Sequence, residues 1–227
     1  GQPRSRAVQR LHRAARLVVN PSGKAPRIGV FGGAFDPPHN AHVALAEAAL
    51  AQLDLAELHV IPTGQAWHKS RALTPKEDRL AMTRLAFSGL KGTVVVDSRE
   101  VLRDGPTYTL DTLNELQREQ PGAQLVLIMG ADQASALPTW HGWQDILGIA
   151  IVSVAYRALS TGDTARFDPK MLPGLPAGAR FEALELPPMD TSATEIRRCA
   201  ALGVDISSLV PPTVARYIDQ HHLYRSA

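Results

Sequence analysis

Strand-like and helix-like segments alternate along the chain from Arg27 onward. Short runs of β-branched and aliphatic residues predict strands, because these side chains suit a pleated, buried surface. Between them lie longer segments of helix formers with an apolar face. The strand-like runs are RIGVFGG (27–33), ELHVIPT (57–63), TVVVDS (93–98), QLVLIMG (124–130), IAIVSVAY (149–156) and RFEALELP (180–187). This alternation predicts a parallel sheet covered by helices on both faces, an α/β fold of the doubly wound, Rossmann-like type.

Helical patterns fill the spaces between these strands and the end of the chain. Asn40 is the expected N-cap of the first helix. The second has Thr74 as expected N-cap, Pro75 at its first position and Glu77 as the acid of a capping box. The patterns are 41–53, 74–89, 107–122, 193–203 and 212–222, the last two forming C-terminal helices. The Pro- and Gly-rich segment 160–180 predicts a long surface loop.

Charge divides the chain into two unequal parts. Residues 1–27 contain seven Lys and Arg and no acidic residue, whereas the other 200 residues contain 17 basic and 22 acidic side chains, a net charge of −5. We therefore expect a basic N-terminal extension at 1–26, helical or disordered, followed by one domain at 27–227. Such an extension fits a surface helix, and it also has features of a nucleic-acid-binding arm or an organelle transit peptide. Nucleic acid is nevertheless not an expected partner.

Two absences restrict the class of protein. No apolar run approaches the roughly 18 residues of a membrane-spanning helix, and the longest, at 146–156, is interrupted by Gly148 and Ser153. Cys199 is the chain's single cysteine, so no intrachain disulfide can form. These features lead us to expect a cytoplasmic protein with no membrane partner.

The segment VFGGAFDPPHNAH, residues 30–42, joins the first predicted strand to the first helix. Its paired glycines allow a tight turn and a close approach of the backbone to a ligand. His39 and His42 follow at the helix start, where unpaired N–H groups and the helix dipole attract anions, especially phosphate. Two imidazoles there can donate hydrogen bonds to phosphoryl oxygens as charge builds in a transition state. The segment therefore predicts a phosphate-binding site.

The segment 30–42 has other interpretations. Two solvated histidines in a turn are the plainest one. A zinc site lacks a convincing third ligand or a cysteine partner. Gly29, Gly32 and Gly33 do not form G-x-G-x-x-G, and PSGKAP (21–26) lacks the leading glycine and the Ser/Thr of a P-loop. Any phosphate must therefore be bound in some other way.

Six segments, in unbroken order from about Arg27 to Arg225, resemble one protein family. GGAFDPPHNAH (32–42) resembles the GGTFDPPHxGH signature of the bacterial nicotinate-nucleotide adenylyltransferases, within the HxGH nucleotidyltransferase superfamily. The resemblance implies adenylyl transfer from ATP to nicotinate mononucleotide (NaMN), which gives nicotinate adenine dinucleotide and pyrophosphate in NAD biosynthesis and requires Mg²⁺. The other similar segments are IPTGQAWHK (61–69), DSREVLRDGPTYTLDTL (97–113), LIMGADQASALPTWHGWQDIL (127–147), TSATEIRR (191–198) and LVPPTVARYIDQHHLY (209–224).

The resemblance assigns the phosphate side of the site. It implies that His39 and His42 contact the ATP phosphates and that Arg197 offers a guanidinium to the β- or γ-phosphate. The other implied ATP-binding residues are Gly32, Gly33, Phe35, Lys69, Ser192 and Thr194. Read without the resemblance, residues 192–197 are equally an N-capped surface helix, and Lys69 a solvated loop lysine. Mg²⁺ is expected on the triphosphate itself, with Asp36 reaching it through water at most, so no protein metal site is expected.

The acceptor side follows from the same resemblance. Trp140 is expected to stack on the nicotinate ring, and backbone N–H groups around Thr107 and Tyr108 to bind its carboxylate. That arrangement favours the acid over the amide, because an amide NH₂ facing an N–H donor leaves polar groups unpaired. Asp132 is placed to bind a ribose hydroxyl, or else to cap a helix. Trp140 and Trp143 could both be core residues.

Three small residues depart from the family pattern. Ala41 replaces the glycine of HxGH, Ala34 stands where Thr or Ser is common, and Ala193 replaces a serine of ISSTxIR. None removes a charged group or a histidine, so we interpret the chain as an active enzyme. The alternatives are an adenylyltransferase for nicotinamide mononucleotide (NMN) or phosphopantetheine and, more remotely, a non-catalytic nucleotide- or RNA-binding protein. The oligomeric state cannot be read from the sequence.

Overall fold

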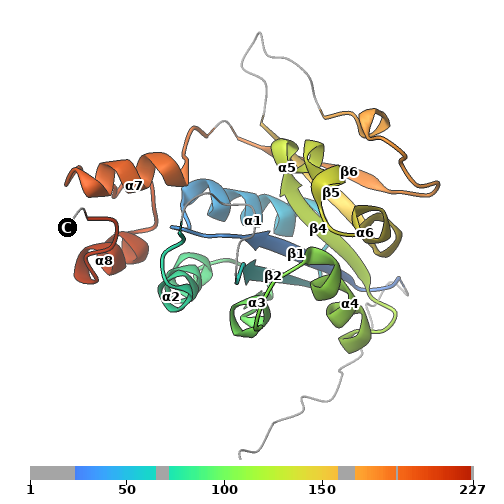
Figure 1. Cartoon of the computed structure of the whole chain (residues 1–227), viewed down its shortest axis with the longest axis horizontal. Coiled ribbons are helices and arrows are strands. Elements are labelled where there is room, and N and C mark those ends of the chain that lie inside the picture. Colours follow the sequence, from blue (N-terminus) through green and yellow to red (C-terminus); the bar gives the residue numbers. More distant parts are fainter. Residues whose placement is uncertain (1–23, 65–71, 158–166, 188, 226–227) are drawn as a thin grey trace, which may run out of the picture.

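A parallel sheet forms the centre of the molecule in a computed structural model, which describes residues 24–64, 72–157, 167–187 and 189–225 (Figure 1). The six strands have the order β3-β2-β1-β4-β5-β6, and every neighbouring pair is parallel. They are β1 (Arg27–Gly33), β2 (Glu57–Pro62), β3 (Val94–Val96), β4 (Gln124–Gly130), β5 (Ala150–Arg157) and β6 (Phe181–Leu186). Each predicted strand is present, and the predicted Rossmann-like α/β class is confirmed.

Alternating side chains on the strands build a core on each face of the sheet. In β4, Leu125, Leu127 and Met129 belong to one buried cluster, and Val126 and Ile128 to the other. This follows from the two-residue period of a strand, and burial on both faces explains why the strand reads as a continuous apolar run.

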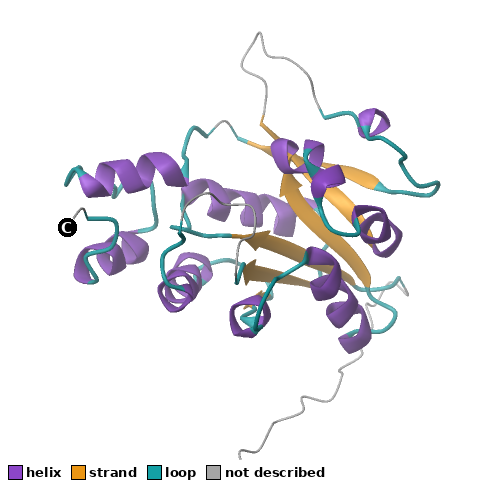
Figure 2. Cartoon of the chain, in the orientation of Figure 1, coloured by secondary structure: helices purple, strands orange, loops and turns teal. Residues whose placement is uncertain are grey.

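Helices cover both faces of the sheet (Figure 2). The first face packs against α1 (Asn40–Gln52), α2 (Lys76–Phe87), α7 (Ala193–Ala201) and α8 (Pro212–Gln220). The second packs against α4 (Thr109–Glu119), α5 (Ala131–Ser135), the 3₁₀ turn η1 (Leu137–Thr139) and α6 (Trp143–Ile149). A short helix, α3 (Arg99–Leu102), follows β3, and a second 3₁₀ turn, η2 (Pro169–Met171), precedes β6.

Both predicted N-caps are wrong by one residue. Helix α1 begins at Asn40, and His39, in extended backbone, is its N-cap. The side-chain amide of Asn40 donates instead to the Ser208 carbonyl at 3.0 Å. Helix α2 begins at Lys76 with Pro75 at the cap position. The Thr74 N–H donates to the Asp36 carboxylate at 3.2 Å, so Thr74 joins two loops rather than capping the helix.

Short helices were missed where the chain passes from β4 to β5. Helix α6 extends to Ile149, and β5 begins only at Ala150, although the sequence there reads as one apolar run. Parts of the predicted N-terminal extension and of the 160–180 loop, together with Lys69, lie outside the described residues; residues 167–180 form a loop that carries η2. None of the helices in the described ranges has both the length and the apolar character needed to cross a bilayer.

The strand order reverses between β1 and β4. From β1 the chain moves outward through β2 and β3, and then returns to the other side of β1 for β4, β5 and β6. Ligands of doubly wound sheets bind at such a switch point, beyond the carboxyl ends of the strands. The loop that follows β1 lies there.

Candidate active site

A cavity of about 270 Å³ lies at the carboxyl ends of β1, β2 and β4. The wall from β1 and its loop is formed by Gly32, Gly33 and Ala34. The wall from the segment that enters α4 includes Thr107, Tyr108, Thr109 and Thr112, and the remaining lining includes Glu100, Gln133, Trp140 and His141. Two of the predicted acceptor segments, 107–108 and 140, therefore line the same cavity as Gly32 and Gly33.

The two glycines of this loop have different surroundings. A Cβ on Gly33 would lie 3.1 Å from the ring of Phe35, closer than ordinary packing allows. A Cβ on Gly32 would meet only the Ile61 carbonyl oxygen, at 3.9 Å. A methyl group at position 33 would therefore force the Phe35 ring to shift by a few tenths of an ångström, whereas one at position 32 would occupy cavity space without disturbing the protein around it.

Phe35 is a buried residue of the loop after β1. It is 1% exposed, and its backbone has a φ of 47°, a left-handed conformation that is unfavourable for a bulky residue. Its ring packs edge-on against Phe31, Phe87 and His42, with centroid distances of 5.4, 5.7 and 5.0 Å. Aromatic packing thus holds a strained residue directly beneath one of the two histidines.

His39 and His42 stack at the start of α1. Their ring centroids are 3.7 Å apart, and the His39 N–H donates to Nδ1 of His42 at 3.2 Å. His39 is 6% exposed, and burial lowers its pKa to about 4, so its ring is neutral at physiological pH. Its buried Nδ1 has no hydrogen-bond partner within the described part of the chain. Such an atom is costly to leave unpaired, so His39 is kept at this position at some expense in stability.

The predicted second phosphate segment contacts the loop between β1 and α1, residues 34–39, which we call the histidine loop. Ser192 is the N-cap of α7, and its hydroxyl accepts a hydrogen bond from the Glu195 N–H at 3.2 Å. The Arg197 guanidinium donates to the backbone carbonyl of Asp36 at 2.8 Å and to the Thr194 hydroxyl at 3.2 Å. Residues 192–197 are thus attached to the loop that carries the histidines, 161 residues away along the chain.

Arg79 organises the loops around the cavity and was not identified from the sequence. It is 1% exposed, and its guanidinium donates to the carbonyls of Thr74, Ala34, Thr63 and Gly64. A buried cation is tolerated because these carbonyls replace its water shell. No local signal marks this role, since an arginine between acidic and apolar residues of a helix reads as a surface residue.

The acceptor residues are only partly assembled. The ring of Tyr108 lies against that of His141, with a centroid distance of 4.4 Å, and Trp140 lines the cavity beside them. Trp140 and Trp143 are both half-buried and pack against the core of the second face, as the alternative interpretation expected. Asp132, by contrast, is exposed on α5 and does not line the cavity, although its neighbour Gln133 does. Asp132 is not the cap of that helix either, because Gly130 is the N-cap of α5.

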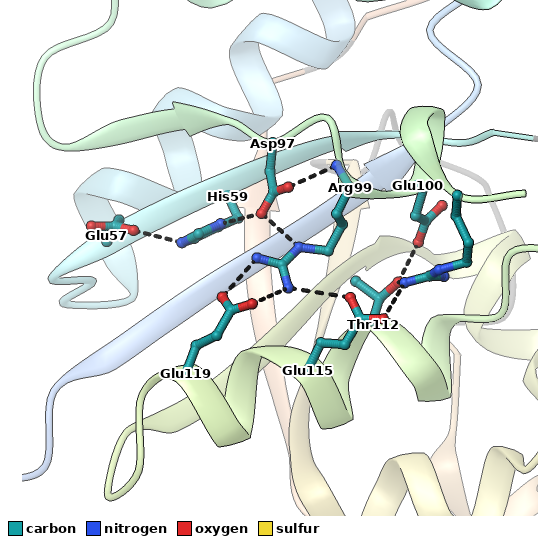
Figure 3. Close-up of polar contacts among 9 residues, drawn as sticks. Glu57, His59, Asp97, Arg99, Glu100, Thr112, Glu115 and Glu119 are labelled. Atoms are coloured by element: carbon teal, nitrogen blue, oxygen red, sulfur yellow. Dashed lines mark hydrogen bonds and ion pairs between the residues drawn. The ribbon is translucent and has the colours of Figure 1, made fainter. Parts of the chain in front are cut away.

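A network of charged side chains lies beside the cavity (Figure 3). Buried His59 of β2 contacts Glu57 and, at 2.9 Å, Asp97; Asp97 in turn accepts a hydrogen bond from Arg99. Burial alone would lower the pKa of His59, but the hydrogen bonds and charges of Asp97 and Glu57 raise it to about 9. Burial likewise opposes the ionised form of Asp97, yet His59 and Arg99 lower the pKa of Asp97 to about 2.

The same network reaches the cavity through α4. Arg99 pairs with Glu119, Arg103 pairs with Glu115, and the Thr112 hydroxyl donates to Glu100 at 2.7 Å. Burial raises the pKa of Glu100, and the hydrogen bond from Thr112 offsets part of that rise. Glu100 was missed from the sequence, although it stands in the DSREVLRDGPTYTLDTL segment that carries the resemblance. The segment thus encodes both a cavity wall and its support.

Two observations concern the side chains that could hold a metal ion. Within the described ranges, no three His, Cys, Asp or Glu side chains lie close enough together to hold a metal ion. The carboxylate of Asp36, which is 2% exposed, already accepts hydrogen bonds at both oxygens. Asp36 is therefore not free to be a direct ligand.

Comparisons with known proteins agree with the resemblance. The cytidylyltransferase-like family profile matches residues 30–199. A protein of Albidiferax ferrireducens named "Probable nicotinate-nucleotide adenylyltransferase" is 54% identical over 201 residues, which cover 88% of this chain and 99% of that protein. A protein of the same name from Methylibium petroleiphilum is 44% identical over 202 residues, which cover 87% of this chain and 92% of that protein. Among solved structures, the chain is similar to "Plasmodium falciparum nicotinic acid mononucleotide adenylyltransferase complexed with NaAD". The match has a TM-score of 0.72 at 19% sequence identity and covers 88% of this chain and 97% of that one, so the two proteins share a fold.

Proposed function

This chain belongs to the cytidylyltransferase-like family and, within it, to the nicotinate-nucleotide adenylyltransferases, and from that membership we propose its reaction and the residues that perform it. The enzyme transfers the AMP group of ATP to NaMN, giving nicotinate adenine dinucleotide and pyrophosphate in NAD biosynthesis. One observation in this molecule carries the proposal. An aromatic-lined cavity suited to a pyridine nucleotide adjoins a histidine loop suited to phosphates, at the switch point of the sheet.

The reaction is a displacement at phosphorus. A phosphate oxygen of NaMN forms a bond to the α-phosphorus of ATP, and the bond from that phosphorus to the bridging oxygen of the leaving pyrophosphate breaks. Positioning and charge stabilisation carry most of such a reaction, and no covalent enzyme intermediate is needed. His39 and His42 hydrogen-bond the α-phosphate as its charge develops. Because the pKa of His39 is about 4, it acts there as a neutral imidazole rather than as a cation.

The leaving side of the triphosphate is assigned to α7 and its neighbours. Arg197 binds the β- or γ-phosphate, and Ser192 and Thr194 contribute hydroxyls and N–H groups of the first turn. Support comes from the hydrogen bond between Arg197 and the Asp36 carbonyl, which brings this helix to the histidine loop. Lys69 is proposed as a further phosphate ligand on the resemblance alone. Gly32, Gly33 and Phe35 shape the surface on which the nucleotide lies.

The acceptor occupies the cavity. Its volume, about 270 Å³, is close to the lower end of small-molecule pockets, about 300 Å³, which suits a pyridine ring with part of its ribose. Trp140 stacks on the ring, and the N–H groups of Thr107 and Tyr108 bind the carboxylate. A role for Asp132 at a ribose hydroxyl would have to lie outside this cavity.

Mg²⁺ is proposed to accompany ATP. Bound to the triphosphate, it would neutralise part of the charge that opposes approach of a second phosphate. The chain's own contribution is the set of donors at His39, His42 and Arg197. We also propose a cytoplasmic location and an extension at residues 1–26, on the grounds of the single cysteine and of the beginning of β1 at Arg27.

Product identification tests the proposal. The full chain is incubated with ATP, Mg²⁺ and NaMN, and the products are separated and weighed by mass spectrometry. We expect nicotinate adenine dinucleotide and pyrophosphate in equal amounts. Pyrophosphate without the dinucleotide, or turnover only with NMN, would contradict the assignment of the acceptor.

A further inference from the structure

The C-terminal segment of the chain returns to the histidine loop. After α8, Leu223 and Tyr224 pack against the core of the first face, and the described chain ends beside α7 and α8 (Figure 1). The Tyr224 hydroxyl donates to Oδ1 of Asp36 at 2.6 Å, across 188 residues of sequence. The backbone of Tyr224 has a φ of 63°, which is unusual for a tyrosine. Tertiary contacts must therefore hold this residue in place.

Asp36 is the meeting point of four segments. Its second carboxylate oxygen accepts a hydrogen bond from the Thr74 N–H, at the approach to α2. Its backbone carbonyl accepts a hydrogen bond from Arg197 of α7. Three residues further along the chain stands His39. The hydroxyl of Tyr224 thus acts on the residue that connects the histidine loop to the arginine proposed to bind ATP.

The burial of Asp36 and the raised pKa of Tyr224 both stabilise the hydrogen bond between these residues. Asp36 is 2% exposed, so its carboxylate depends on protein donors in place of water. Burial, and then the charge and hydrogen bond of Asp36, raise the pKa of Tyr224 well above its ordinary value. The hydroxyl therefore stays protonated, and remains a donor, well above neutral pH.

We propose that Tyr224 is a positioning residue for ATP, which acts through Asp36 to fix Arg197 and the histidine loop relative to each other. The inference rests on the proposed function, because it assigns Arg197 to the phosphates. Without the hydroxyl, Oδ1 of this buried carboxylate loses the donor that Tyr224 supplies, and Arg197, already bonded to the backbone of the same residue, is the cation drawn toward it. The guanidinium is then less available to the triphosphate.

The chain supplies its own control. Tyr217 of α8 also donates to a carboxylate, Oδ1 of Asp78, at 2.8 Å. Tyr217→Phe and Tyr224→Phe therefore remove the same kind of hydrogen bond from neighbouring parts of the chain. Both variants should melt at a lower temperature than the wild type. Only the second changes the proposed phosphate site.

The experiment measures the affinity for ATP by calorimetry and the KM values for ATP and NaMN. We expect Tyr224→Phe to weaken ATP binding and raise its KM about tenfold, with the KM for NaMN unchanged, and Tyr217→Phe to leave both unchanged. Adding Asp36→Asn to Tyr224→Phe removes the charge that attracts Arg197, and should restore part of the ATP affinity. Equal effects of the two Tyr→Phe changes, wild-type ATP affinity in Tyr224→Phe, or no recovery in the double variant would each overturn the proposal. Since ATP affinity is measured without turnover, the inference is tested even if NaMN is not the acceptor.

Discussion

His39 and His42 stack face to face, 3.7 Å between ring centroids, where α1 begins at the end of the loop after β1. Burial holds the pKa of His39 near 4, so this ring adds no positive charge to the stacked pair at neutral pH. A neutral imidazole at a helix N-terminus adds an uncharged hydrogen-bonding group to the N–H groups that already attract an anion. The arrangement favours phosphate as ligand without burying a positive charge on His39.

Replacing His39 should separate stability from activity. In the wild type the pKa of His39 falls from 6.5 to about 4 on folding, so stability is present above pH 6.5 and is lost as the pH falls toward 4. That loss amounts to about 3 kcal/mol in the free energy of unfolding. His39→Asn should abolish this acid loss, because asparagine does not titrate and also suits the N-cap position, while kcat falls about 100-fold. Urea unfolding at pH 4 and 7 checks it; an unchanged acid loss would contradict the account.

His59 should produce the opposite dependence on pH. Its pKa rises from 6.5 to about 9 on folding, so its stabilisation is complete below pH 6.5 and is lost as the pH rises through 9. The loss is again about 3 kcal/mol. We expect the free energy of unfolding of the wild type to fall between pH 6.5 and 9, and that of His59→Asn to be lower at pH 6.5 but flat across this interval. A wild-type curve without this decline would refute the role given to the Glu57 and Asp97 contacts.

The two glycines of the loop should respond differently to one added methyl group. Gly33→Ala brings a Cβ to 3.1 Å from the Phe35 ring and should lower the free energy of unfolding by about 1–3 kcal/mol. Gly32→Ala meets nothing nearer than 3.9 Å and should keep the wild-type melting temperature while raising a substrate KM, because its methyl group enters the cavity. Each alanine variant is the control for the other. If Gly32→Ala bound both substrates normally, the cavity would not be the substrate site.

Glu100 should make the choice between acid and amide depend on pH. Burial raises the pKa of this cavity carboxyl, so it becomes charged only above the usual range of a glutamate. Once charged, it opposes the carboxylate of NaMN but not the amide of NMN. We expect the ratio of the two KM values, NaMN over NMN, to rise about three- to tenfold with pH in the wild type and to stay constant in Glu100→Gln. A parallel rise in the glutamine variant would assign the effect to another group.

The sequence predicted the sheet well because burial on two faces leaves a strong mark. Every strand-like apolar run became a strand, and the strands form one parallel sheet as expected. Helix starts were less predictable, because the partners of Asn40 and Thr74 lie 168 and 38 residues away. No local propensity reports such a partner.

The residues of the site show the same difference between local sequence signals and long-range contacts. Residues with a motif, such as His39, His42 and Arg197, could be named in advance, and a hydrogen bond joins the helix of Arg197 to the loop before the two histidines. The residues that hold those loops could not. Arg79 and Tyr224 read as ordinary surface and terminal residues, and their roles arise only from long-range contacts with backbone carbonyls and with Asp36.

The most direct test of the central claim compares two histidine replacements in one assay of pyrophosphate release from ATP, with NaMN or NMN as acceptor. His42→Asn removes the imidazole from the loop, and His222→Asn changes an exposed histidine in left-handed backbone that asparagine tolerates. We predict that the wild type and His222→Asn turn over NaMN in preference to NMN, and that His42→Asn loses 100-fold or more in kcat, about the usual effect of such a group. Near-wild-type turnover of NaMN by His42→Asn would contradict the account.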